Sequence, residues 1–284
     1  MLSLHTNSAA MSIQKTLGNT QTDLSTSMTR LGTGYRINSA KDDAAGLQIA
    51  TRLSAQTRGM NVAMQNTQNA SSMLQTADGA FGEVSNVLLR MKDLATQAAD
   101  ASSSDDDKTA MQAEYDALGK ELANVMANTS YGGSKLLNGG KLAAELTFQI
   151  GAASAETMTV DFSTQLTSVD TSLTAVSGAY KTPATPGTEL TTDANAQIDL
   201  LSKALKDVGS LRSSLGASEN RLEHVFNNLG NMSTNTGDAE GRIMDVDYAS
   251  ESANMTSKQI LMQAGTAMLK QSSSMTQMVM SLIQ

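Results

Sequence analysis

LSAQTRGMNVAMQNTQNASSMLQTADGAFGEVSNVLLRMKDLATQA, residues 53–98, is the longest regular stretch of this chain. From Leu53 to Ala98, alternating steps of three and four residues fall mostly on Leu, Met, Ala, Val and Phe. Such a seam predicts a single helix roughly 70 Å long, at about 1.5 Å per residue. A helix of that length needs other long helices to cover its seam. The sequence therefore predicts a mainly α fold, a long coiled-coil-like helical bundle.

Two further segments carry the helical pattern that would complete this bundle. The first follows the polar stretch Asp100–Asp107, whose carboxylates suit the N-terminus of a helix, and it should fold back antiparallel on the long helix. The second begins near Asp193 and continues to Met232. The apolar positions are Met111, Tyr115, Leu118, Leu122 and Val125 in the first, and Ala194, Ile198, Leu201, Leu205, Val208, Leu211, Leu215, Leu222, Val225, Leu229 and Met232 in the second.

Between these helices the pattern changes to turns and alternation. Tyr131–Ser134 and Asn138–Gly140 carry the glycines that end helices. Two short alternating runs follow, which are Leu146, Phe148 and Ile150, and then Met158, Val160 and Phe162. They predict a small β-hairpin. Residues 163–192 are the least patterned, with both prolines among Thr, Ser, Ala and Gly, and predict a surface loop or a vestigial outer domain with some short strand.

Both ends of the chain carry apolar stripes that repeat every seven residues. A stripe this narrow is buried only when another helix lies against it. We therefore expect the first and last helices to pair with each other, and the apolar side chains left over to pack on other copies of the chain. The residues expected to mediate polymerisation are Leu17, Leu24, Met28 and Leu31 near the start, and Leu261, Met268, Met275 and Leu282 near the end.

The composition suits a thin helical bundle better than a compact sphere. Aromatic residues make up only 3% of the chain, whereas there are 18 methionines. The absence of cysteine excludes disulfides, thiolate metal sites and cysteine nucleophiles. The start of the chain lacks the features of a cleaved secretory signal, and no run of about 18 apolar residues occurs, so we expect no membrane insertion.

The charge of the chain is unevenly distributed. The formal net charge is −8, but residues 1–58 carry +3 and residues 249–284 carry +1, so the residues between them carry −12. A solvated acidic face accounts for this excess, and complementary contact between the basic ends and acidic middles of neighbouring copies is the alternative. Nucleic-acid binding is not expected, because no basic patch interleaved with aromatics is present.

The sequence contains no convincing catalytic, cofactor or metal constellation. His5 and His224 each lack a second histidine at ligand spacing. Asp105–Asp107 lacks the spaced oxygen ligands and the glycine of a calcium loop, and Asp42–Asp43 is better suited to start a helix or to pair with a nearby Arg36 or Lys41. Gly32–Gly34 lacks the further glycine and lysine of a phosphate loop. We expect no enzyme activity, no cofactor and no metal.

Long motifs at both ends resemble the signatures of bacterial flagellins. Near the start, Arg30–Leu53 reads RLGTGYRINSAKDDAAGLQIATRL. Near the end, the resemblance continues in Ser214–Asn231 (SLGASENRLEHVFNNLGN), Asp245–Leu261 (DVDYASESANMTSKQIL) and Gln263–Gln271 (QAGTAMLKQ). It covers nearly everything outside residues 163–192.

This resemblance implies a subunit that polymerises head-to-tail into the bacterial flagellar filament for motility. Residues 1–43 and 241–284 would form a terminal coiled-coil domain that lines the filament core and orders on assembly. Residues 44–162 and 193–240 would form the long-helix module with its hairpin, and residues 163–192 would replace the outer domains of larger flagellins. The implied partners are many copies of the same chain, the type III export apparatus, a secretion chaperone on the C-terminal segment, and the filament cap and junction proteins. The implied location is extracellular.

One further expectation comes from the same resemblance. Leu88–Gln97 (LLRMKDLATQ) matches the flagellin surface that Toll-like receptor 5 recognises, with Arg90, Leu94 and Glu114 at the corresponding positions. The alternative is that Leu94 is a subunit contact and Glu114 a solvated charge. This sequence also departs from the family where it has Leu89 in place of a frequent Gln, and Lys92 in place of a frequent Arg.

Two other functions compete with the filament subunit. A hook-filament junction protein would have similar terminal helices and the same export route. A secreted adhesin or immune ligand would act as a monomer and would need an exposed specific surface, which residues 163–192 offer little of.

Overall fold

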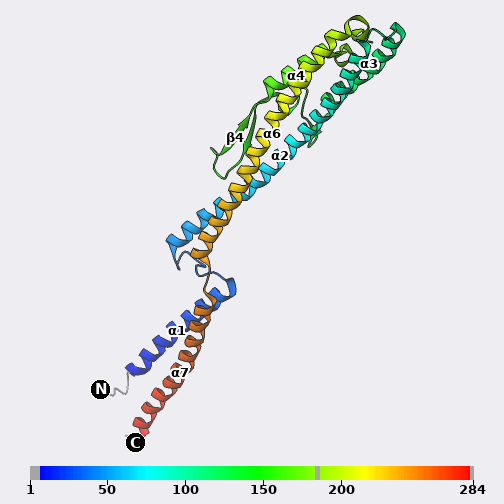
Figure 1. The fold of residues 1–284 in the computed structure, drawn as a ribbon. Helices are drawn as coiled ribbons and strands as arrows, with labels where there is room; N and C mark the ends of the chain where they lie inside the picture. Colours follow the sequence, from blue (N-terminus) through cyan, green and yellow to red (C-terminus); the bar gives the residue numbers. More distant parts are fainter. Residues whose placement is uncertain (1–6, 183–185, 282–284) are drawn as a thin grey trace. The chain divides into compact units, whose positions relative to one another are not determined.

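The computed structural model describes residues 7–182 and 186–281, and helices dominate it (Figure 1). It divides into two compact units. The terminal unit comprises the chain up to Thr57 together with the chain from Thr234 onward, and the central unit comprises Arg58–Ser233. The long helices α2 (Ala44–Ala98) and α6 (Glu189–Met244) each contribute residues to both units.

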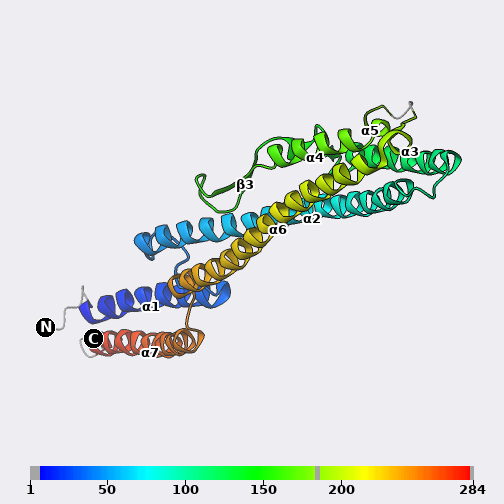
Figure 2. The ribbon, with the colours of Figure 1, turned by 45° about the horizontal axis from the view of Figure 1, so that its top comes forward.

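In the central unit, α2, α3 and α6 lie side by side as a bundle (Figure 2). The helix α3 (Asp105–Asn128) folds back antiparallel on α2 after the short connection 99–104, since Arg90 pairs with Glu114. The helix α6 also runs antiparallel to α2, since Asp78 pairs with Arg212 and Asn61 with Ser233. The core contains fully buried side chains from all three helices, which are Leu74, Phe81, Leu88 and Met91 of α2, Tyr115 and Leu122 of α3, and Leu201, Val208, Leu211 and Leu215 of α6. The predicted long-helix bundle is confirmed.

Local sequence fixes where these helices begin. The side chain of Ser104 accepts a hydrogen bond from the backbone N–H of Asp107, while Asp107 accepts one from the N–H of Ser104. The Ser104 hydroxyl also donates to the Asp107 carboxylate at 2.6 Å, and this bond, followed by the one from the Ser104 N–H, holds the pKa of Asp107 below its ordinary value. In α6, the backbone at Asp193 is non-helical and its carboxylate accepts from the N–H of Ala196 at 3.1 Å. The helix therefore begins at Glu189, four residues before the predicted start, and Asp193 is a kink within it.

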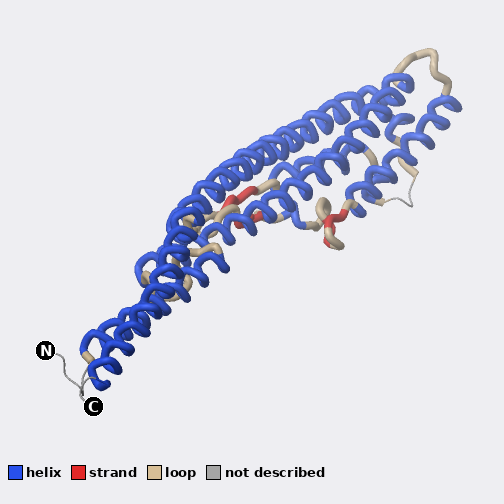
Figure 3. The backbone as a smooth tube through the Cα atoms, turned by 90° about the horizontal axis from the view of Figure 1, so that it is seen from below, coloured by secondary structure: helices blue, strands red, loops and turns tan. Residues whose placement is uncertain are grey.

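Two small antiparallel sheets interrupt the helices (Figure 3). The strands β1 (Ser130–Tyr131) and β2 (Ser134–Lys135) form a tight turn, and a short 3₁₀ helix, η1 (Lys141–Ala143), follows. The predicted hairpin is confirmed as β3 (Leu146–Gln149) paired with β4 (Thr157–Val160). Leu146 pairs with Val160, and Phe148 pairs with Met158, so the alternating apolar side chains share one face against the bundle.

The prediction of a surface loop with some short strand for residues 163–192 was wrong. This segment contains α4 (Ser163–Val176), α5 (Gly178–Lys181) and the start of α6, with no strand in its described part. Buried apolar residues of α4 complete the central core, and these are Leu166, Val169, Leu173 and Val176. The segment is therefore part of the bundle. Its Ser and Thr content hid the helical spacing, because these residues are frequent in loops.

Polar contacts also bind α4 to α6. The Ser172 hydroxyl donates to the Asp207 carboxylate at 2.5 Å and accepts from the Lys203 ammonium at 2.8 Å. The hydrogen bond from Ser172 is the main reason that the pKa of Asp207 lies below its ordinary value. A buried hydroxyl that is satisfied in this way stabilises the position of α4.

Gly59 on α2 is the point at which the hairpin turn packs. A Cβ at this position would lie 2.7 Å from the Ala152 Cβ and 3.1 Å from its Cα. We expect Gly59→Ala to lower the stability of the central unit by about 1–2 kcal/mol, because the turn backbone must move. Gly79→Ala is the control, since nothing lies within 4 Å of its added methyl group, and it should raise stability by about 0.5–1 kcal/mol. Urea unfolding measures both, and equal effects would contradict the packing role of Gly59.

In the terminal unit, α1 (Ser8–Thr33) and α7 (Tyr248–Ser281) pair along their lengths (Figure 1). They are antiparallel, because Asp23 pairs with Lys258 at 2.7 Å and Arg30 pairs with Glu251 at 3.8 Å. This pairing of the first and last helices confirms the sequence prediction.

The connections at one end of this helix pair are tied together. Gly34 ends α1 in the left-handed conformation at φ +78°, which glycine adopts without strain. Its carbonyl accepts from the N–H of Val246, and the N–H of Arg36 donates to the carbonyl of Met244 at 2.6 Å. The backbone leaving α1 is thereby fixed to the backbone entering α7.

Candidate assembly surface

The N-terminal stripe faces α7. Leu24 is buried, and Leu17 and Leu31 are half-buried. Leu17 lies so close to α7 that a Cβ added at Gly265 would be 3.0 Å from its Cδ1. Three of the residues predicted to mediate polymerisation are thus already covered within one chain, at least in part.

The C-terminal stripe lies on a different side of α7 from the one that contacts α1. Leu261, Met268 and Met275 are 53%, 60% and 52% exposed. The side of α7 that faces α1 instead carries half-buried Met255, Met262 and Leu269, which share a face with Gly265. Leu282 falls outside the described residues.

Together these helices present an apolar surface to solvent. We define the terminal apolar surface as the exposed side chains Met11 and Met28 of α1 with Ile260, Leu261, Met268 and Met275 of α7. A monomer gains no stability from large apolar side chains exposed to water, and an apolar surface on a helix pair is typical of a site of protein association. Burying each of them stabilises a contact by about 1.5–3 kcal/mol before the ordering entropy is subtracted.

The residues matched to the receptor surface differ in accessibility. Arg90 donates to one carboxylate oxygen of Glu114 through Nε at 2.9 Å and through Nη2 at 2.7 Å, and both side chains are exposed. Leu94 is only 3% exposed and belongs to the central core. The structure therefore brings Arg90 and Glu114 together on the surface and places Leu94 beneath them.

No group of three or more His, Asp or Glu side chains within residues 7–182 and 186–281 could hold a metal ion. His224 is exposed on α6, and His5 falls outside the described residues. Asp43 starts α2 by accepting from the N–H of Gly46 at 2.8 Å, as predicted. Among the described helices, none combines the length and apolar character needed to cross a bilayer.

Sequence reasoning missed the contacts that decide which side of α7 meets α1. The ion pairs of Asp23 with Lys258 and of Arg30 with Glu251 lie on that side, as does the bond from the Asn7 amide to the Ser272 hydroxyl at 3.2 Å. Their sequence signal was present in the opposite charges on the two terminal segments. These charges predict specific ion pairs only when the antiparallel register of α1 and α7 is known.

Comparisons with known proteins agree with this architecture. A model of the bacterial flagellin N-terminal helical region matches residues 4–141, and one of the C-terminal helical region matches residues 198–283. A flagellin of Halalkalibacterium halodurans is 38% identical over 279 residues, with 98% of each chain covered. Flagellin A of Vibrio anguillarum is 33% identical over 379 aligned residues, with both chains fully covered.

A solved structure also shares the fold. The structure of a putative flagellar hook-associated protein from Vibrio parahaemolyticus superimposes with a TM-score of 0.59, covering 72% of this chain and all of that one. Its sequence identity is 15%, so this likeness concerns the fold alone. The two family models and the relatives matched over the full chain carry the assignment, and the chain belongs to the bacterial flagellin family.

Proposed function

We propose that this chain is the structural subunit of a bacterial flagellar filament and that its terminal helices order fully on assembly. The terminal apolar surface is the observation that carries the proposal. Its side chains are too exposed to stabilise the monomer and are placed on the two helices that the flagellin relatives share. A subunit contact of this kind is head-to-tail and does not close, which is the geometry of helical filaments.

The domain roles follow from the same proposal. Residues 1–43 and 241–284 form the filament core, and residues 44–162 and 193–240 form the layer around it. The segment 163–192 stands where larger flagellins carry outer domains. Consistent with a shorter outer part, the alignment to the Vibrio flagellin is longer than this chain, so that relative carries residues that this chain lacks.

The remaining partners are part of the proposal as well. The chain leaves the cell through the flagellar type III export apparatus, with a secretion chaperone on its C-terminal segment, and meets the cap and junction proteins at the filament. It acts as a structural protein without catalysis. Toll-like receptor 5 binds the exposed Arg90–Glu114 pair on the free subunit, with Leu94 holding the underlying helix in place.

Seeded sedimentation tests the proposed function. Full-length monomer should sediment after short filament seeds are added, whereas a version that lacks residues 249–284 should stay in the supernatant. Circular dichroism of the truncated protein should retain the helices of the central unit, which makes loss of growth a loss of contact. Full-length protein that stays monomeric with seeds would contradict the proposal and would favour a junction protein or a secreted ligand.

A further inference from the structure

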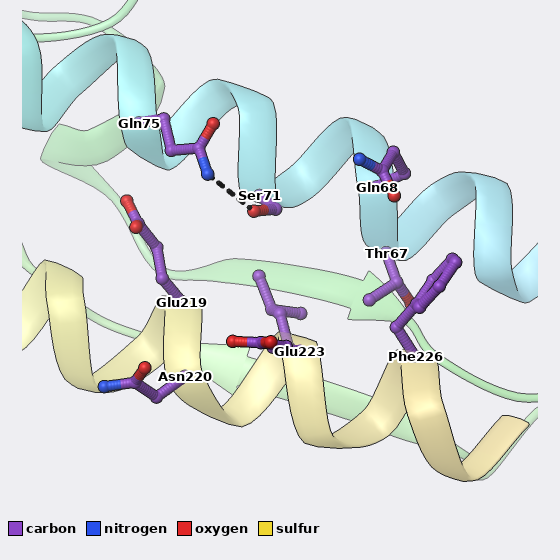
Figure 4. A pocket seen from close by; sticks show the side chains of 9 residues that line it. Thr67, Gln68, Ser71, Gln75, Glu219, Asn220, Glu223 and Phe226 are labelled. Carbon is purple, nitrogen blue, oxygen red and sulfur yellow. Dashed lines mark hydrogen bonds between the residues drawn. The ribbon is translucent and has the colours of Figure 1, made fainter.

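A polar groove lies between α2 and α6 in the central unit (Figure 4). Its volume is about 350 Å³, and Phe226 lies at one end of it beside Thr67. The other lining residues are Gln68, Ser71 and Gln75 from α2 and Glu219, Asn220, Leu222 and Glu223 from α6. The only hydrogen bond among the side chains drawn in Figure 4 joins Gln75 to Ser71, at 3.4 Å. The groove is therefore lined by polar groups that bind little to one another.

Glu219 is the residue in this groove whose carboxylate lacks a hydrogen-bond donor. It reaches from α6 toward α2 in Figure 4, and its Oε1 is buried without a hydrogen-bond partner among the described residues. The charged groups around it are Asp78 on α2 and Arg212 and Glu223 on α6. Burial first, and then the charge of Asp78, raises the pKa of Glu219.

Arg212, on the same helix as Glu219, is already paired with another carboxylate. Arg212 binds Asp78 through two hydrogen bonds, at 2.8 and 3.1 Å, which occupy its guanidinium. A buried carboxylate oxygen without a protein donor is costly, so a hydrogen-bond donor that reaches it through the groove would be stabilised there.

The shape and chemistry of the groove favour a guanidinium group. The volume greatly exceeds that of a metal ion, and the described residues contain no cluster of three acidic ligands. Glu219 and Glu223, one helical turn apart, supply acceptors for a planar fork of N–H donors. Phe226 is 37% exposed and offers a ring face on which a guanidinium can stack.

This chain itself carries suitable donors. Arg52 and Arg58 on α2 are exposed, and neither makes an ion pair within residues 7–182 and 186–281. They belong to the basic first 58 residues, while the groove belongs to the acidic middle of the chain. We infer that the groove is an intersubunit socket that receives Arg52 or Arg58 of a second copy. The inference rests on the proposed function as a filament subunit.

Occupation of the socket makes assembly depend on pH. In the free subunit, burial and then the charge of Asp78 raise the pKa of Glu219, so its carboxyl group keeps a proton to a higher pH than an ordinary glutamate does. An incoming guanidinium favours the ionised carboxylate and lowers that pKa, so assembly releases a proton. Growth should therefore be favoured as pH rises, and the critical concentration should fall by up to tenfold per pH unit from this group.

The variant Glu219→Gln separates the socket from a structural role. The neutral amide removes the cost of a buried charge, so the monomer should melt at the same temperature or higher. The critical concentration of seeded growth should nevertheless rise about tenfold, and the part of its pH dependence due to Glu219 should vanish. Glu121→Gln, an exposed change on α3, is the matched control and should alter neither.

A charge reversal identifies the partner. Glu219→Arg alone, Arg52→Glu alone or Arg58→Glu alone should impair growth, and combining E219R with the correct arginine reversal in one chain should restore it. Growth of E219Q with the wild-type critical concentration and pH dependence would overturn the inference while leaving the proposed function intact. Thermal stabilisation of wild-type monomer by Mg²⁺ that E219Q loses would also overturn it, in favour of a small-cation site. Wild-type monomer that fails to grow would refute the proposed function itself.

Discussion

A chain with Leu261→Asp and Met268→Asp should fold normally and fail to extend filament seeds. Both side chains are more than half exposed in the free subunit, so the substitutions cost the monomer little. In the assembled state each new carboxylate would be buried without a partner, at a cost of several kcal/mol. Because each 1.4 kcal/mol is a factor of ten, the critical concentration should rise by more than about 100-fold. Seeded sedimentation measures this rise.

The control for this variant adds the same charge to the same helix. Thr256→Asp with Gln263→Asp places two carboxylates, again seven residues apart, on exposed polar positions of α7 that lie outside the terminal apolar surface. It should retain most of the growth. Equal loss in both variants would assign the defect to the charge of α7 alone and would contradict a specific apolar contact.

The second large effect concerns the core of the central unit. Leu88 and Leu89 are neighbours on α2, yet Leu88 is fully buried and Leu89 is 51% exposed. Leu88→Ala removes three heavy atoms from a packed core and should cost about 2–5 kcal/mol of unfolding free energy. Leu89→Ala makes the identical chemical change and should stay within about 0.5 kcal/mol of wild type.

Urea unfolding followed by circular dichroism compares the two variants. A loss of this size is a large share of the roughly 5–15 kcal/mol that separates folded from unfolded domains. Similar midpoints for the two variants would mean that the seam of α2 is not packed as described, and the bundle would have to be reconsidered.

Sequence periodicity predicted the elements whose burial is one-sided. The seam that ends at Ala98 and the alternation around Phe148 and Met158 each place apolar residues on one face only, so the period identifies helix or strand. The same logic failed for α4. There, Ser and Thr occupy most solvent-facing positions, and their preference for loops concealed the helical spacing of the apolar residues. Those apolar residues pack against the bundle, and this packing stabilises the helix.

Predicting the candidate site met a different difficulty. Leu261 and Met262 are adjacent, as are Met268 and Leu269, so α7 carries two overlapping seven-residue stripes. Hydrophobicity cannot distinguish them. The side facing α1 is selected by charge pairing with α1 and by the close approach of Leu17 to Gly265, and both depend on the register of the two helices. The stripe predicted from the sequence, Leu261, Met268 and Met275, is the one that stays exposed and can contact other copies of the chain.

Methionine is the commonest residue of the terminal apolar surface, and this has a chemical consequence for the life of a subunit. A thioether fits irregular neighbours because it is flexible and polarizable, but an exposed one is readily oxidised to a polar sulfoxide. Met11, Met28, Met268 and Met275 all stand open to solvent in the free chain. A free subunit is therefore sensitive to oxidation at these methionines. Under the proposed function, assembly buries them and protects the subunit from that oxidation.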